Sequence, residues 1–239
     1  MFWGIFPDRL AVRLCGATLP EAHQVMQSPA TKKDAAFDAI LFDVGGVLLT
    51  NGWDHVERTA TYDHFGLSEG DRGEIEARHP AEYDLLERDT ISLNEYLERV
   101  VFFAPREFSR FAFLATMLSQ SQPFPGSAMA VLQELAEDRP CLLGLLNNEG
   151  ALLHEHRMEA FGLAAMFDAQ FSSCYLGLRK PEPKIFQRVK QMLGERRPRI
   201  LFIDDRIANV EAAAAAGFTA IHFTGEHELR AQLVQLGVL

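Results

Sequence analysis

Short apolar runs alternate with segments of helical periodicity along most of the chain after residue 36. The apolar runs are typical of strands buried on both faces of a sheet, and they cover residues 39–43, 141–147, 169–173, 199–204 and 219–223. The helical segments cover residues 127–138, 151–161, 183–194, 206–216 and 226–236. Strands that alternate with helices favour a parallel sheet with helices on both faces. The predicted fold class is therefore α/β, with a Rossmann-like three-layer α/β/α core.

Residues 53–122 interrupt this alternation, because they have helical periodicity but no strand-like run. The segment Pro123-Phe124-Pro125-Gly126 predicts a turn, after which the alternation of strands and helices resumes. We predict an inserted helical cap at 53–122 and a core made of 37–52 plus 123–239. An insertion after the first strand lies over the carboxyl edge of the sheet, where a lid excludes water from a site.

The first 36 residues do not fit the pattern that follows. We interpret residues 1–36 as an N-terminal extension. A disordered arm and an early start codon, with Met26 as an internal start, are the alternatives that stay open.

Composition narrows the classes of partner. The chain has 239 residues, of which 48% are hydrophobic, so a sizeable core can form. Its formal net charge of -10 repels phosphate backbones and anionic lipid, so we expect neither a nucleic acid nor a membrane as partner. The cysteines are odd in number and lack metal-ligand spacing, which predicts reduced thiols and a cytoplasmic location: Cys15, Cys141 and Cys174.

Asp43 ends the first apolar run and is followed by Gly45-Gly46. The glycines indicate a tight turn, so a carboxylate is expected at the carboxyl end of a strand, where open α/β sheets bind ligands. Asp is also a common turn residue, so this segment alone leaves a structural role open.

Polar residues follow two other strands and one loop. Asn147-Asn148 and Asp204-Asp205 each end a predicted strand, and Lys180 precedes a proline-rich helix start. Taken singly, Lys180 is explained as a surface lysine and the aspartates as helix caps. Arg179 is interpreted as a solvated charge. Together and in this order, the segments favour a shared site.

This ordered set resembles the haloacid dehalogenase-like (HAD) hydrolase superfamily from Phe37 to about Phe223, with the helical insertion as its cap. The segment 42–48 is similar to the helical-cap branch, which includes sugar-phosphate phosphatases and the phosphatase domain of bifunctional epoxide hydrolases. The resemblance implies that Asp43 is a nucleophile that forms an aspartyl-phosphate. It also implies that Lys180 bridges nucleophile and phosphate and offsets their charge.

The resemblance further implies a Mg²⁺ site, because this hard cation takes oxygen ligands. Asp43, Asp205 and the backbone carbonyl of Gly45 would hold the metal, and Asp204 would orient a metal-bound water or hold the turn. Asn147 stands where the family has Ser or Thr. Its amide, with Asn148 beside it, is predicted to bind the substrate's phosphate.

Gly45 departs from the family pattern, since most of the phosphatases have a second Asp there. That Asp protonates the leaving group and then activates water, a contribution of typically about 10²–10⁴ in rate. Three explanations stay open: a replacement such as Asp54 or His55, a substrate with a good leaving group, or a slow or inactive protein.

The sequence therefore predicts a Mg²⁺-dependent phosphatase of a small phosphorylated metabolite, as a monomer or homodimer. A non-catalytic phospholigand-binding protein is the alternative. A 2-haloacid dehalogenase is disfavoured by Gly45 and by the paired Asp204-Asp205. The residues suggested for substrate specificity lie in the cap: Trp53, His55, Tyr83 and Arg88.

Overall fold

The computed structural model describes residues 35–194 and 196–239. The prediction of an N-terminal extension therefore lies almost wholly outside the described residues, as do Cys15 and Met26. In the described part of the chain, no helix combines the length and the apolar character needed to cross a bilayer.

The core is one parallel sheet of five strands in the order β3-β2-β1-β4-β5, which confirms the predicted fold class. The strands are β1 (Ala39–Phe42), β2 (Leu142–Asn147), β3 (Ala169–Ser172), β4 (Ile200–Asp204) and β5 (Thr219–His222). Phe42 at the end of the central strand is in register with Leu145 and Ile203 on its two neighbours. The residues that follow β1, β2 and β4 therefore meet at one edge of the sheet.

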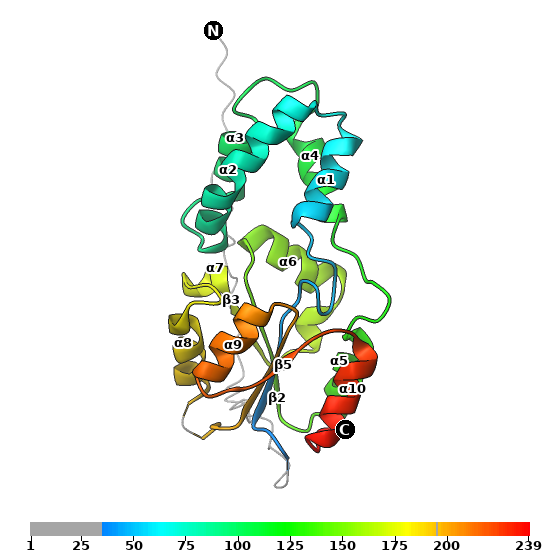
Figure 1. Ribbon diagram of the computed structural model, residues 1–239, viewed down its shortest axis with the longest axis vertical. Coiled ribbons are helices and arrows are strands. Elements are labelled where there is room, and N and C mark those ends of the chain that lie inside the picture. Colours follow the sequence, from blue (N-terminus) through cyan, green and yellow to red (C-terminus); the bar gives the residue numbers. More distant parts are fainter. Residues whose placement is uncertain (1–34, 195) are drawn as a thin grey trace, which may run out of the picture.

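Helices cover both faces of the sheet (Figure 1). Ile40 and Phe42 share a core with α5 (Met129–Asp138), α6 (Ala151–Ala160) and α10 (Glu226–Gln235). Ala39 and Leu41 point to the other face and share a core with α8 (Pro183–Leu193) and α9 (Ile207–Ala215). This alternation explains why β1 is apolar throughout rather than amphipathic. Two short elements were not predicted, the 3-10 turn η1 (Leu163–Ala165) and helix α7 (Ser173–Leu176).

A separate helical unit stands over the carboxyl ends of the strands (Figure 1). It comprises α1 (His55–His64), α2 (Glu69–Glu87), α3 (Leu93–Val100) and α4 (Arg110–Ser119). Ser68, Ser92 and Ser109 cap three of these helices with side-chain hydrogen bonds, which fixes where each begins. The unit has its own core, to which Leu153 of α6 also belongs. We interpret this unit as the predicted cap.

Candidate active site

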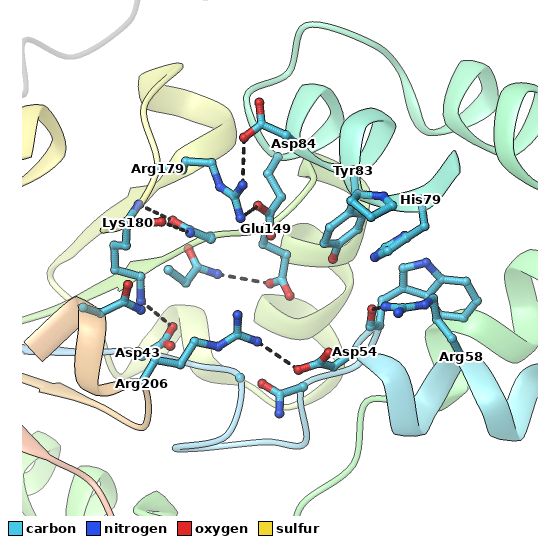
Figure 2. Close-up of a pocket in the computed structure, with 18 of the residues that line it drawn as sticks. Asp43, Asp54, Arg58, His79, Tyr83, Asp84, Glu149, Arg179, Lys180 and Arg206 are labelled. Carbon is cyan, nitrogen blue, oxygen red and sulfur yellow. Dashed lines mark hydrogen bonds and ion pairs between the residues drawn. The ribbon is translucent and has the colours of Figure 1, made fainter. Parts of the chain in front are cut away.

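A pocket of about 350 Å³ lies between the carboxyl edge of the sheet and the helical unit. The core side of the pocket carries Asp43 and Lys180, and the helical side carries His79 and Tyr83 (Figure 2). Asn147 of β2 also lines the pocket. The residues predicted from separate segments of the sequence therefore converge on one cavity. Its size is in the range that holds a small metabolite.

Lys180 is the centre of the polar contacts on the core side. Its buried Nζ lies 3.0 Å from Asp43 Oδ1 and 2.6 Å from Asp204 Oδ2. The Asn148 side chain fixes the Lys180 backbone, because Asn148 Oδ1 accepts from the Lys180 N–H and Asn148 Nδ2 donates to the Lys180 carbonyl, both at 2.8 Å. Asn148 thus positions the lysine, a contact that sequence analysis did not anticipate.

The two adjacent aspartates after β4 have different surroundings. Asp204 is fully buried and accepts hydrogen bonds from Lys180 Nζ, from Asn209 Nδ2 at 3.0 and 3.1 Å, and from the Arg206 N–H at 2.8 Å. Asp205 Oδ1, in contrast, is buried and has no hydrogen-bond partner among the described residues. Asp204 is therefore saturated by the protein, whereas Asp205 keeps an oxygen available.

Asp43, Asp204 and Asp205 each bring one carboxylate oxygen to within 4.8 Å of the others. The turn after β1 makes this approach possible, because Gly46 has a φ of 75° and any Cβ there would overlap the Asp205 carboxylate. A side chain at 46 would be strained by its backbone and would displace Asp205. The second glycine of the turn is therefore explained by close approach as well as by conformation.

Burial and the neighbouring carboxylates raise the pKa of Asp43 and of Asp205. Burial raises the pKa of Asp43 to about 8 against the lowering effect of Lys180, with Asp204 adding to the rise. Burial, and then the Asp204 charge, likewise raise the pKa of Asp205. Burial lowers the pKa of Lys180, but Asp204 and Asp43 more than offset it, so the net shift is upward. Lys180 and Arg206 do not balance three carboxylates, and the arrangement suits a further cation.

Asn147 lies at the tip of β2 and lines the pocket, as predicted. Its Nδ2 donates to Glu149 Oε2 at 3.1 Å, and its Oδ1 is buried without a partner among the described residues. The amide is therefore oriented by Glu149, a residue that the sequence analysis did not single out.

Ion pairs join the helical unit to the core around the pocket. Arg179 lies 2.7 Å from Asp84 and 2.7 Å from Glu87, both on α2, so its interpretation as a solvated charge is wrong. Arg88 of the helical unit pairs with Glu182 of the core. These contacts explain why an arginine stands directly before Lys180.

The cap residues suggested for specificity divide into two groups. Trp53 and Tyr83 line the pocket, whereas His55 is exposed and Arg88 is engaged in the ion pairs of the cap boundary. Asp54, one suggested substitute for the missing acid, caps α1 and pairs with Arg206 at 3.0 Å.

Sequence reasoning also missed a buried ion pair beside the pocket. Glu149 Oε1 lies 2.7 Å from Arg157 Nη1, and both side chains are almost completely buried. A signal was present, because Arg157 shares the inward face of α6 with Leu153 and Met158. A charged residue on a buried helix face needs a partner.

Comparisons with known proteins agree with this architecture. The sequence profile of the haloacid dehalogenase-like hydrolases matches residues 37–217. Flavin mononucleotide hydrolase 1 of Arabidopsis thaliana is 29% identical over 164 residues, which cover 69% of this chain and 65% of that protein. A sesquiterpene phosphatase of Aspergillus oryzae is 32% identical over 71 residues, 30% of this chain and 36% of that protein. The chain thus spans less than two thirds of either relative.

A solved structure has the same fold. A HAD family enzyme of Bacteroides thetaiotaomicron, in complex with magnesium and inorganic phosphate, superimposes with a TM-score of 0.64 at 20% identity over 79% of this chain and 95% of that one. The order of the strands, the converging polar residues and the match over most of the chain lead to one conclusion. The chain belongs to the family of haloacid dehalogenase-like hydrolases.

Proposed function

We propose that this chain is a Mg²⁺-dependent phosphatase that hydrolyses the phosphate ester of a small metabolite through an aspartyl-phosphate on Asp43. The observation that carries the proposal is the contrast between the carboxylates: Lys180 binds Asp43 and Asp204, while Asp205 keeps a buried oxygen without a partner. Among the relatives, the names of a flavin mononucleotide hydrolase and of a sesquiterpene phosphatase also support phosphate chemistry.

The donor set fits Mg²⁺. Carboxylate and carbonyl oxygens are its preferred protein ligands, and Asp43 and Asp205 bring carboxylate oxygens together at one edge of the sheet. The carbonyl of Gly45, which lines the same pocket, is proposed as a further ligand. When bound, the metal would offset the charge that prevents a carboxylate from approaching a phosphate. Asp204 serves in this proposal to hold Lys180 and the turn, because its oxygens are already occupied.

The side chains would act as follows. An Asp43 oxygen attacks phosphorus, and the ester oxygen departs with its bonding electron pair. Lys180 neutralises the Asp43 carboxylate and the developing charge from a position fixed by Asn148. Asn147 lies at the same edge and is proposed, with Asn148, to contact the phosphate oxygens.

The helical unit would exclude water from this reaction. Trp53 is buried in the core of the helical unit, where its ring packs edge-on against Phe113 and its Nε1 donates to the Tyr96 hydroxyl at 2.9 Å. The ion pairs of Arg179 with α2 join this unit to the core beside the pocket. A polar pocket of this volume favours a small phosphorylated substrate over a protein or nucleic acid.

The experiment measures phosphate release from a panel of phosphate monoesters with and without Mg²⁺. Asp43→Asn should abolish release, whereas Asp38→Asn should retain it. Asp38 is a matched control, because it precedes the same strand at the opposite end of the sheet and pairs with Arg199 at 2.7 Å. Metal-independent halide release from 2-haloacids would contradict the proposal, as would phospholigand binding without turnover.

A further inference from the structure

Gly45 leaves the proposed reaction without the usual proton donor, and the structure shows what fills that space. A Cβ at position 45 would lie 3.2 Å from Asn51 Oδ1 and 3.5 Å from Arg157 Nη1. The amide of Asn51 is neither an acid nor a base near neutral pH, and a guanidinium stays protonated. Neither neighbour of Gly45 can therefore donate the proton. A candidate donor is a group that contacts one of these neighbours.

That group is the Glu149 carboxyl, which contacts Arg157 Nη1 from the side of β2. Glu149 follows Asn147-Asn148 at the strand tip, and its Oε2 accepts from the Asn147 amide at 3.1 Å. Its backbone is fixed by Ser173 Oγ, which accepts from the Glu149 N–H at 2.9 Å. Figure 2 shows Glu149 in the middle of the pocket, between Asp43 and Lys180 on one side and Tyr83 on the other.

Other acids and bases that line the pocket contact groups away from Asn147 and Gly45. Asp54 caps α1 and pairs with Arg206, and Glu87 pairs with Arg179 at the cap boundary. His79 Nδ1 lies 2.7 Å from the Tyr96 hydroxyl, within the core of the helical unit. Of the described residues, Glu149 alone combines an acidic side chain with direct contacts to both the predicted phosphate-binding amide and the guanidinium beside Gly45.

We propose that Glu149 is the general acid and base of this chain and takes over the task of the missing aspartate at position 45. This inference rests on the proposed function, since it assigns a further residue to the same reaction.

The proton balance is simple. As Asp43 attacks phosphorus and the ester P–O bond breaks, the Glu149 carboxyl gives its proton to the departing oxygen, which leaves as an alcohol. Glu149, now a carboxylate, then takes a proton from the water that attacks phosphorus. The bond between phosphorus and the Asp43 oxygen breaks, which frees phosphate, restores the Asp43 carboxylate and leaves Glu149 protonated for the next cycle.

The electrostatic surroundings suit a group that must both donate and accept. Burial raises the pKa of Glu149 to about 7, with Arg157 and Lys180 opposing the shift and Glu87 adding to it. A general acid–base group works best when its pKa is close to the working pH. Of these neighbours, Arg157 is on α6, Glu87 on α2 and Lys180 in the loop before α8, so charges from three elements set the pKa.

The experiment compares two substrates in wild type and Glu149→Gln. An alkyl phosphate needs a proton on its leaving oxygen, whereas p-nitrophenyl phosphate releases a stable phenolate. Glu149→Gln should lower kcat for the alkyl phosphate by about 10²–10⁴-fold. For p-nitrophenyl phosphate, the rate of aspartyl-phosphate formation should fall by roughly tenfold or less. This rate is measured as the pre-steady-state burst of phenolate. Asp38→Asn, at the opposite end of the sheet, should leave the ratio between the substrates unchanged.

An equal loss on both substrates would show that Glu149 only supports the structure, and it would overturn the inference. Absence of Mg²⁺-dependent turnover in the wild type would instead overturn the proposed function, and this inference with it. If Glu149→Gln does not fold, the wild-type enzyme alone can test for a proton donor. Its rates across aryl and alkyl phosphates should depend only weakly on the leaving-group pKa, and a steep decline with increasing pKa would refute a proton donor.

Discussion

The adjacent residues Asp204 and Asp205 should respond in opposite ways to the same substitution. Asp204 accepts hydrogen bonds from Lys180, Asn209 and the Arg206 backbone and is completely buried, so Asp204→Asn removes a charge that the protein itself uses. Asp205 has a buried oxygen without a partner among the described residues, so Asp205→Asn removes a charge that only a bound cation would use.

The expected magnitudes follow from these contacts. Breaking a buried ion pair by removing one partner costs about 3–5 kcal/mol, and in a chain of this size each kcal/mol lowers Tm by about 2–4 °C. Asp204→Asn should therefore lower Tm by roughly 6–20 °C. Burial raises the pKa of Asp205, which means that its charged form costs free energy in the fold. Asp205→Asn should leave Tm unchanged or higher in the absence of Mg²⁺.

The assay is thermal unfolding with and without Mg²⁺. A ligand that binds only the folded state stabilises it, by about 2.7 kcal/mol at a hundred times Kd. Wild type and Asp204→Asn should both gain Tm in Mg²⁺, whereas Asp205→Asn should gain almost nothing. The reasoning is refuted if Asp204→Asn loses the Mg²⁺-dependent gain while Asp205→Asn keeps it.

Three further predictions follow from the same geometry. Gly46→Ala should weaken Mg²⁺ binding in titration calorimetry, because its Cβ would displace the Asp205 carboxylate. Gly66→Ala has a similar φ of 61° but open space around it, and should cost only stability. Burial lowers the pKa of His79 to about 4, below its usual 6.5. Between pH 4 and 6.5, His79 is therefore protonated in the unfolded chain but neutral in the folded one. The free energy of unfolding should therefore fall as pH decreases through this window, by up to about 3 kcal/mol, and urea titrations of His79→Gln should show a smaller fall. Arg179→Gln removes a partly exposed ion pair with Asp84, worth roughly 0.2–1 kcal/mol, and leaves the buried Glu87 without its partner. The Asp84 part of its loss of Tm should shrink at high salt.

The architecture could be predicted because each strand carries its own signal. All five strands of the sheet lie within one residue of the predicted ranges, since parallel strands buried on both faces have uninterrupted apolar sequences. Asp43, Lys180 and the aspartates after β4 also meet as expected, because carboxyl ends of parallel strands share one edge. The order and direction of the strands are enough to predict both the sheet and the meeting of these residues.

The roles of individual side chains depend on loop conformation, which topology does not determine. The sequence predicts only a phosphate contact for Asn148, and the structure adds that its side chain pairs with the backbone of Lys180, 32 positions away. Arg179 was expected to be solvated, yet it bridges to α2 because the helical unit stands over that loop. Both contacts join segments distant in sequence, and no local pattern encodes them.

Gly45 and Arg157 are best understood together, which leads to a last prediction. Restoring the usual acid with Gly45→Asp should not improve hydrolysis of an alkyl phosphate. The new Cβ would lie 3.5 Å from Arg157 Nη1, so the carboxylate would pair with the guanidinium and its pKa would be lowered. Position 45 is only partly buried, so burial would not offset this lowering as it does for the completely buried Glu149, and the two carboxylates would compete for the same arginine. The rate should therefore fall, with Gly73→Asp, at a helical position with open space around it, as the control. A higher rate for Gly45→Asp would show that Arg157 does not control the acids around it, and that the proton of the wild-type reaction comes from elsewhere.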